Sequence, residues 1–350
     1  MIKIFSLSAS LLLTFMLAFP QHMGSHAFKI TKGQMPNMTV DKNNVVHIVY
    51  GRGDSIMYIS SKNGVTFNSP SLVAVLPKLM SSAMRGPQIA SAENGLVVTA
   101  CTNQGDIYCY KEGLPGKWTK IKRINDVNES AKEALMALSA DGLRVYTIWL
   151  GIRGAKGQNV YGSESVNGGK TWTKNILVYA SPDGSVCECC KPSVVVKAEN
   201  VFVMFRNLVS GNRDLYLIKS TNGGQTFGEA IKLGNGSWKL DGCPMDGGGL
   251  VINKNGNPET VWRREGRIFA ASPGTREKEV GEGKGCSIET LNNKVFYAWS
   301  EGENIIVKKP DGTKMNPGKG SLPLLKALNA SQVICVWENE KEIHGSVIDL

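Results

Sequence analysis

Three short segments share one residue pattern, and they constrain the fold of this chain more than any other feature. They read SSKNGVTF (60–67), SVNGGKTW (165–172) and STNGGQTF (220–227), and the last two begin 55 residues apart. Each has Ser first, Gly fifth, Thr seventh and an aromatic residue last. Gly permits the positive φ of a tight turn, and Ser and Thr can bond the turn backbone, so each segment is predicted to be a hairpin between two strands. A fixed period of this length predicts a fold of repeated units.

The same order of short strands recurs along the chain. An apolar second strand, often ending in an aromatic residue, is found at 45–50, 96–101, 144–149, 201–205, 259–262, 295–299 and 333–337. Seven units of small antiparallel sheet predict an all-β fold, a seven-bladed β-propeller, that occupies residues 28–350 as a single domain. The last unit lacks a fourth strand, and FKIT (28–31) is expected to supply it and close the ring. The best helix candidate, ESAKEALMAL (129–138), is expected to be a loop and a first strand.

The three hairpin segments resemble the BNR or Asp-box repeats of the sialidase-like β-propellers. The usual motif has Asp in third place, where this chain has Lys62, Asn167 and Asn222. Asn can make the same turn bonds as Asp. The resemblance implies that the segments are structural hairpins on the face away from the ligand. Because members that cleave sialic acid have six blades, six is the alternative to seven.

The N-terminal residues predict the compartment. Residues 1–27 contain one early Lys, an apolar run and the small residues of SHA, which together predict a secretory signal peptide cut after Ala27. The apolar run is shorter than the ~20 residues of a membrane span. The protein is therefore expected to be secreted or periplasmic, and a monomer. Its formal charge of +10 comes from scattered Lys and Arg without a basic run, which favours an anionic ligand over nucleic acid.

The repeat also predicts which residues meet at the ligand face. In a propeller, the loops that precede the first strands and the loops that join second and third strands open around the central axis. The candidate ligand-binding residues in these loops are Gln34, Arg52, Arg85, Arg153, Arg206 and Arg264. Converging guanidiniums bind a carboxylate, sulfate or phosphate bidentately. We expect an anionic or polyhydroxylated ligand, a glycan, although some of these Arg could instead be rim charges paired with nearby acids.

The resemblance implies an exo-sialidase only in part. Active members bind the substrate carboxylate with three Arg and use a Tyr paired with Glu as nucleophile and an Asp as acid and base. Gln34-Met35-Pro36 stands where the family has its first Arg, and Arg206 and Arg264 match the other two by blade position only. Asp246, followed by three Gly that permit close approach, is the candidate catalytic acid. A glycosidase and a non-catalytic binding propeller both remain open.

The segment GSVCECCKPS (184–193) places three cysteines within four positions. The repeat puts Cys187, Cys189 and Cys190 before the first strand of the fourth blade, next to the loops that carry Cys243 and Cys286. One interpretation is a set of disulfides in which one of the three pairs with Cys243 and another with Cys286. The second is a thiolate site for a soft metal ion, Cu(I) or Zn. A catalytic thiol is the third.

The other three cysteines of the chain lie outside this sector. Cys101 and Cys109 flank a short hairpin on neighbouring strands and are predicted to form their own disulfide. Cys335 lies inside the apolar run VICVW and is expected to be a buried, inert thiol.

Overall fold

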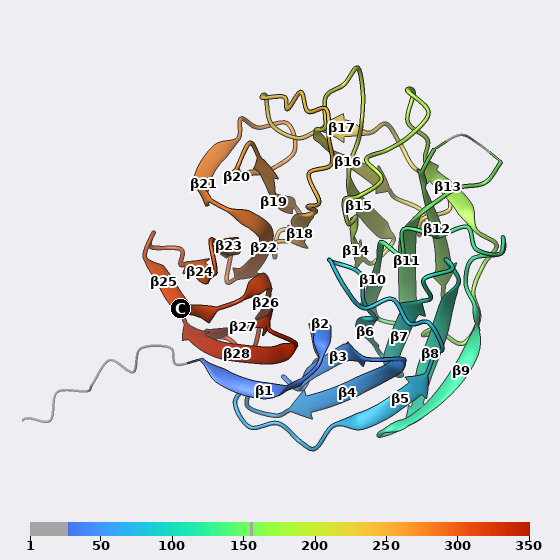
Figure 1. Ribbon diagram of the computed structural model, residues 1–350, viewed down its shortest axis with the longest axis vertical. Helices are drawn as coiled ribbons and strands as arrows, with labels where there is room; N and C mark the ends of the chain where they lie inside the picture. The colour runs from blue at the N-terminus through green and yellow to red at the C-terminus, as the bar shows by residue number, and fades with distance from the viewer. Residues whose placement is uncertain (1–26, 155–156) are drawn as a thin grey trace, which may run out of the picture.

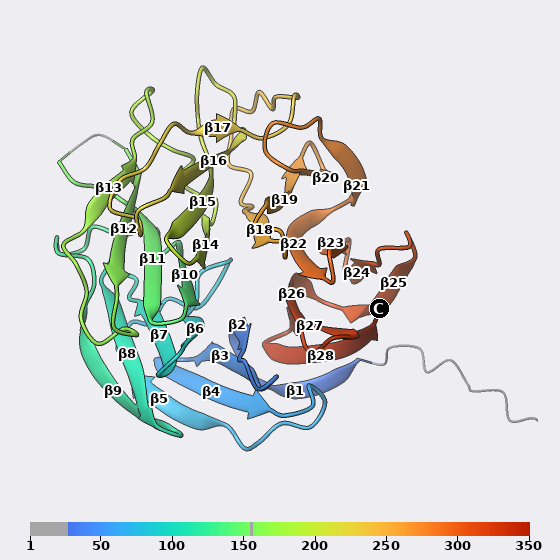
Figure 2. The ribbon, with the colours of Figure 1, turned by 180° about the vertical axis from the view of Figure 1, so that it is seen from behind.

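A computed structural model describes residues 27–154 and 157–350 and shows an all-β, seven-bladed propeller (Figures 1 and 2). Each blade is one four-stranded antiparallel sheet, and the seven sheets are arranged around a common axis. The prediction of seven blades is therefore confirmed. The predicted signal peptide lies outside the described residues, apart from Ala27. Within these residues no helix has the length and apolar character needed to cross a membrane.

The strands follow the chain from blade to blade, and only the last blade takes a strand from the other end of the sequence. Blade 1 contains β2 (Gln34–Val40), β3 (Val46–Arg52), β4 (Ser55–Ser61) and β5 (Ser71–Val75); blade 2 contains β6 (Gln88–Ala92), β7 (Gly95–Cys101), β8 (Ile107–Leu114) and β9 (Lys117–Arg123). Blade 3 contains β10 (Met136–Asp141), β11 (Arg144–Gly151), β12 (Asn159–Ser165) and β13 (Ile176–Tyr179); blade 4 contains β14 (Ser193–Lys197), β15 (Asn200–Arg206), β16 (Leu215–Ser220) and β17 (Ile231–Lys232). Blade 5 contains β18 (Gly248–Ile252), β19 (Pro258–Arg264), β20 (Arg267–Ala271) and β21 (Lys278–Glu282); blade 6 contains β22 (Lys284–Leu291), β23 (Lys294–Glu301), β24 (Asn304–Lys308) and β25 (Lys314–Lys319). Blade 7 contains β26 (Ser321–Ala327), β27 (Gln332–Asn339), β28 (Glu342–Asp349) and the N-terminal β1 (Phe28–Lys32).

The N-terminal strand closes the ring, as the sequence predicts. β1 pairs antiparallel with β28, and Phe28 lies opposite Gly345 in this ladder. A side chain at Gly345 would stand 2.9 Å from the Phe28 ring, so the close packing of this aromatic requires glycine. The pairing covers the outer edge that β28 would otherwise expose, and an exposed edge is a site for pairing with another chain.

The seven predicted second strands are β3, β7, β11, β15, β19, β23 and β27, and they form the core of each blade. These strands read as continuous apolar runs because they are covered on both faces by neighbouring blades. Trp149, Trp299 and Trp337 are fully buried on three of them. The expectation for residues 129–138 is also confirmed, because β10 begins at Met136 after a loop.

Polar side chains on the innermost strands join adjacent blades. The Ser139 hydroxyl accepts the backbone N–H of Val196 at 3.0 Å, and the Ser287 hydroxyl accepts that of Leu325 at 3.1 Å. Asn37 accepts a backbone N–H of β6 in the same way, at 2.9 Å. These bonds satisfy backbone donors that face the axis, where no neighbouring strand could accept them.

The segments 165–172 and 220–227 form the same hydrogen-bonded turn between third and fourth strands. In the first of them, Asn167 Oδ1 accepts the hydroxyl of Ser165 at 3.0 Å and the backbone N–H of Thr171 at 2.9 Å. Asn222 makes the equivalent bonds in the second. A side chain at Gly224 would stand 2.1 Å from the Tyr146 ring, so this turn fits against the preceding blade. The turns are structural and hold neighbouring blades together.

The segment 60–67 departs from the sequence alignment by one residue. Asn63, rather than Lys62, accepts the backbone N–H of Thr66 at 2.8 Å, and Ser61 rather than Ser60 donates to it. The turn is one residue shorter than the other two, so aligning the segments by their Gly, Thr and aromatic residues misassigns the Asn. The Asp-like position is therefore occupied by Asn in all three turns.

We expect Asn167→Ala to lower the free energy of unfolding by about 1 kcal/mol, because the backbone N–H of Thr171 loses its acceptor. Asn167→Asp is the matched control, since a carboxylate keeps both acceptor bonds and loses only the bond that Nδ2 donates to Thr171. Chemical unfolding of the three proteins measures the difference. Equal losses for both variants would contradict the structural role assigned to this oxygen.

Candidate functional site

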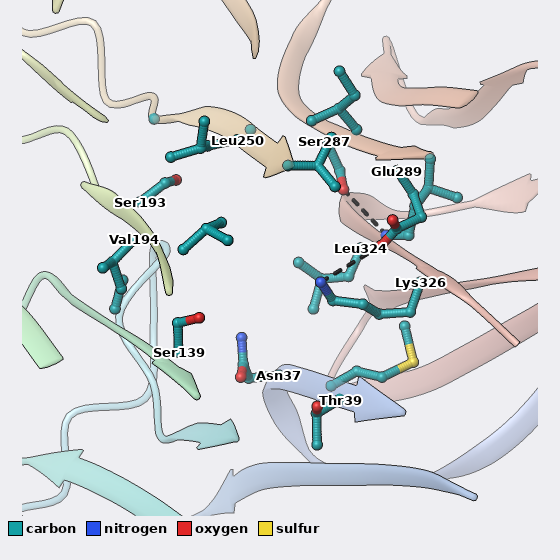
Figure 3. A pocket seen from close by; sticks show the side chains of 18 of the residues that line it. Asn37, Thr39, Ser139, Ser193, Val194, Leu250, Ser287, Glu289, Leu324 and Lys326 are labelled. Atoms are coloured by element: carbon teal, nitrogen blue, oxygen red, sulfur yellow. Dashed lines mark hydrogen bonds and ion pairs between the residues drawn. The ribbon is translucent and has the colours of Figure 1, made fainter. Parts of the chain in front are cut away.

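The first strands of the blades line a cavity of about 970 Å³ along the propeller axis. This volume lies within the range of small-molecule binding sites. Figure 3 shows side chains of β2, β10, β14, β18, β22 and β26 around this space, among them Asn37, Thr39, Ser139 and Ser193. The lining combines hydroxyl, amide and aliphatic groups. Such a surface can bind a ligand that has both polar substituents and apolar faces.

Lys191 differs from the exposed Lys254 of the cavity lining in lying deep inside the ring, and it has no acidic partner among the described residues. It precedes Pro192 and β14, and its Nζ donates to Gln88 Oε1 at 2.9 Å. Among the described residues no carboxylate forms an ion pair with this ammonium. It keeps some surface toward the cavity but lies deep inside the ring, where burial lowers the pKa of Lys191 to about 8. A desolvated ammonium bonded only to a neutral amide is a strong attractor for an anion.

The other charged groups of the cavity are more nearly neutralised. Lys326 and Glu289 form an ion pair at 3.5 Å (Figure 3). Glu338 accepts the backbone N–H of Met35 at 2.6 Å, although burial raises its pKa. Lys191 differs from Lys326 in that no carboxylate pairs with its ammonium.

Asp246, the candidate acid, also lines the cavity and is almost completely buried. Its Oδ2 accepts the backbone N–H of Gly285 at 3.2 Å and lies 4.0 Å from Arg263, whereas its Oδ1 has no hydrogen-bond partner. Burial raises the pKa of Asp246, and the neighbouring Arg206 and Arg263 offset this only in part.

The predicted arginines do not form a ring of free guanidiniums around this cavity. Arg85 pairs with Glu133 at 2.8 Å, Arg153 with Asp126 at 2.6 Å and Arg264 with Glu277 at 2.5 Å. Arg52 donates to the backbone oxygen of Lys32 at 2.9 Å. Neither these arginines nor Gln34, which pairs opposite Gly51 at the start of β2, line the cavity. The alternative of rim charges paired with acids therefore describes Arg85, Arg153 and Arg264.

Arg206 has a different environment, because it is 2% exposed. It donates to the backbone oxygens of Arg213 and Arg263 at 2.7 and 2.9 Å, and its guanidinium lies over the Trp238 ring. It therefore holds the β15–β16 loop of blade 4 against the end of β19 in blade 5. Its charge still acts on the buried groups nearby, including Asp246 and Cys190.

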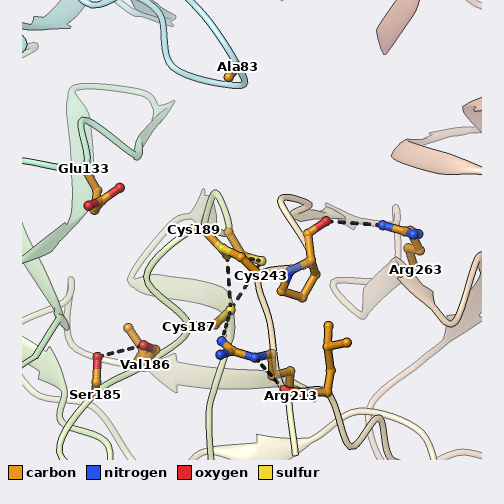
Figure 4. The surroundings of a disulfide bond; sticks show 12 residues. Ala83, Glu133, Ser185, Val186, Cys187, Cys189, Arg213, Cys243 and Arg263 are labelled. Carbon is orange, nitrogen blue, oxygen red and sulfur yellow. Dashed lines mark hydrogen bonds between the residues drawn. A yellow bond between two sulfur atoms is a disulfide. The ribbon is translucent and has the colours of Figure 1, made fainter.

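A disulfide joins the loops that precede β14 and β18 (Figure 4). It links Cys189 to Cys243, with Cα atoms 6.2 Å apart, and Cys286 remains a free thiol. Cys187 and Cys190 are also free and buried beside the bridge. Of the five cysteines that the repeat brings to one sector, four lie in this cluster, and two of them are bridged.

The sulfur atoms of the cluster are in contact. The Sγ atom of Cys187 lies 3.5 Å from that of Cys190 and 3.8 Å from that of Cys189, and Arg213 donates to it at 3.1 Å. The contact with Cys190 and the bond that Arg213 donates lower the pKa of Cys187, whereas burial raises the pKa of Cys190. The two neighbouring thiols therefore differ in acidity.

The predicted Cys101–Cys109 disulfide is absent from the structure. Both residues are buried free thiols. In the β7–β8 ladder Cys109 lies opposite Thr99, and Cys101 lies opposite Ile107. The two cysteines are therefore offset by two residues along the ladder, and Cys109 points to the backbone oxygen of Gly169. Cys335 is a buried free thiol on β27, as expected.

Sequence reasoning missed Lys191, Gln88 and Arg213 as members of the site. It searched the loops for Arg and passed over the Lys of CCKP, which precedes the first strand of blade 4. Its place directly before the Pro that precedes β14 is the signal that could have identified it, because the residues around that Pro line the cavity.

Comparison with known proteins supports the fold. No protein-family model matches the chain, and no curated protein matches it in sequence. An α-L-arabinofuranosidase from Fusarium graminearum, in complex with an iminosugar inhibitor, superposes with a TM-score of 0.53 at 11% identity, over 93% of this chain and 98% of that one. A PL25 ulvan lyase bound to GlcA(1-4)Rha3S superposes with a TM-score of 0.53 at 10% sequence identity. The superposition covers 93% of this chain and 96% of that one. Virginiamycin B lyase from Staphylococcus aureus with quinupristin superposes with a TM-score of 0.55 at 10% sequence identity. The superposition covers 93% of this chain and 99% of that one. These similarities show a shared propeller fold.

Peptide mapping under non-reducing conditions is expected to recover one linked pair, Cys189 with Cys243, and to find Cys101 and Cys109 unlinked. Thiol titration of the unfolded, unreduced protein should then count six thiols per chain. A peptide linking Cys101 to Cys109 would contradict the strand register described above.

Proposed function

We propose that this protein is an exported binding propeller that takes an anionic glycan into its axial cavity. The observation that carries the proposal is the buried ammonium of Lys191, which faces the cavity and has a neutral amide as its hydrogen-bond partner. A carboxylate or sulfate of a ligand would supply the missing negative charge. The hydroxyl and amide groups of the first strands would bind sugar hydroxyls.

The site differs from that expected of a sialidase, and this favours binding over hydrolysis. Arg206 donates hydrogen bonds to two backbone oxygens, and Arg264 forms an ion pair with Glu277. Neither guanidinium is therefore free to bind a substrate carboxylate bidentately. The sequence does not assign a nucleophilic Tyr, and two tyrosines of the blades, Tyr161 and Tyr297, are buried in blade cores. Tyr161 stacks on Trp149, and burial raises the pKa of Tyr297 to about 12. Asp246 remains as an acid that can bind a sugar hydroxyl.

Export fits the position of the first strand. Cleavage after Ala27 would leave β1 intact from Phe28, and β1 is needed to close the ring. A cut only a few residues further on would remove the strand. Mass measurement of the mature N-terminus in the secreted or periplasmic fraction tests this part of the proposal. We expect the mature protein to act as a monomer.

Lys191→Met is expected to weaken the binding of an anionic oligosaccharide about tenfold or more, because a charge-assisted hydrogen bond contributes about 1.5–3 kcal/mol. The substitution replaces a desolvated ammonium by an apolar chain of similar length, so the thermal stability should be unchanged or higher. Isothermal titration calorimetry with sulfated and uronic-acid oligosaccharides measures the affinity.

Lys319→Met is the matched control, since Lys319 is exposed on the outer strand β25 and pairs with Glu303. It should leave the affinity unchanged, and neutral oligosaccharides should bind Lys191→Met and the wild type equally. Equal affinity of Lys191→Met and wild type for every anionic glycan would refute the assignment of this residue.

A panel of fluorogenic sialosides is expected to show no hydrolysis above background, even at high protein concentration, because the arginine and tyrosine groups are committed to the fold. Turnover that disappears in Asp246→Asn would contradict a binding function and identify a hydrolase.

A further inference from the structure

We propose that Cys187, Cys189 and Cys190 form a binding site for a thiophilic closed-shell metal ion, Zn²⁺ or Cu⁺, and that the Cys189–Cys243 disulfide controls whether this site can form. The site is separate from the axial cavity and does not depend on glycan binding. Three observations support the site: the positions of three sulfur atoms, the cations around them, and the membership of Cys189 in both the disulfide and the three-sulfur group.

The three sulfur atoms already have the spacing of a thiolate metal site. Their separations are 3.5 Å between Cys187 and Cys190, 3.8 Å between Cys187 and Cys189, and 4.0 Å between Cys189 and Cys190. Tetrahedral coordination with Zn–S bonds of about 2.3 Å requires sulfur atoms about 3.8 Å apart, and trigonal coordination requires about 4.0 Å. An ion could therefore be bound with little movement of the loop.

The surroundings suit bound thiolates. All three cysteines are buried, so the ion would be shielded from water. Arg213 donates to the sulfur of Cys187 at 3.1 Å (Figure 4), and the buried Arg206 lies within electrostatic range of Cys187 and Cys190. These cations offset the negative charge of several thiolates, and N–H···S bonds of this kind support metal ligands. A donor set of sulfur alone selects a soft ion.

Cys189 cannot supply a thiolate while it is bonded to Cys243. Within the site formed by Cys187, Cys189 and Cys190, the oxidised protein offers two thiols to an ion and the reduced protein offers three. Opening the bridge takes two electrons and two protons from an external dithiol, which becomes a disulfide, and leaves thiols at Cys189 and Cys243. Metal binding then releases thiol protons to solvent. The redox state of one bond thus determines the number of ligands.

The test compares oxidised and reduced protein without oxygen. The mature chain is reduced with a phosphine, desalted, and dialysed against Zn²⁺ or against Cu⁺ in separate arms, beside untreated protein, and bound metal is measured per chain. The reduced form should bind one ion in at least one arm, and the oxidised form should bind it at least a hundredfold more weakly. The arm with the higher affinity identifies the ion.

Two variants test whether the metal is bound by the proposed cysteines. Cys187→Ser should lower the affinity of the reduced protein at least a hundredfold, while Cys335→Ala, which removes a buried thiol of blade 7, should leave it unchanged. Circular dichroism confirms that each variant is folded. Failure of the reduced wild type to bind either ion, or full binding by Cys187→Ser, would overturn the site.

Cys243→Ser tests the control by the disulfide, because it frees Cys189 without a reductant. This variant should bind metal without prior reduction. Should the folded variant fail to bind, or should oxidised and reduced wild type bind equally, the disulfide does not control the site.

Discussion

The whole architecture depends on sheets that are apolar on both faces. On β27 the residues from Val333 to Trp337 are completely buried, and the same strand of every blade is covered from both sides. A four-stranded sheet of this kind cannot be stable in isolation, because each face needs another blade against it. The only arrangement that covers every face in a single chain of such sheets is a ring. The glycine turns strengthen it, since Gly224 fits against Tyr146 of the preceding blade.

Much of this could be predicted from the sequence, because local pattern and the repeat determine it. The seven second strands and the closing role of 28–31 follow from short-range apolar runs. The errors concern relations between distant or offset residues. The role of Asn63 as the turn acceptor could not be predicted, because its turn is one residue shorter than the other two. The predicted Cys101–Cys109 disulfide was wrong because the two cysteines are offset by two residues along the β7–β8 ladder. No pattern along the chain could show that Glu277 reaches Arg264.

The distribution of charge separates the rim of the propeller from its axis. At the rim, Arg85 and Arg264 are neutralised by nearby acids. Near the axis, the loop that precedes β14 carries the disulfide at Cys189 and the free charge of Lys191 two residues later. The loop that precedes β18 likewise carries Cys243 and Asp246. The same two loops therefore carry both the bridged cysteines and two charged residues of the cavity lining.

The pairing of β1 with β28 also sets the order in which the molecule can be completed. A chain is synthesised from its N-terminus, so β1 is made before β28, and the strands β2 to β27 are made between them. Until then the first and last blades each lack a neighbour, and the contacts that close the ring join the most distant parts of the sequence. Contacts of such long range slow folding, because chain entropy must be lost before they form. Closing the ring requires β1 to pair with β28, and before that pairing the edge of β28 is exposed to pairing with another chain.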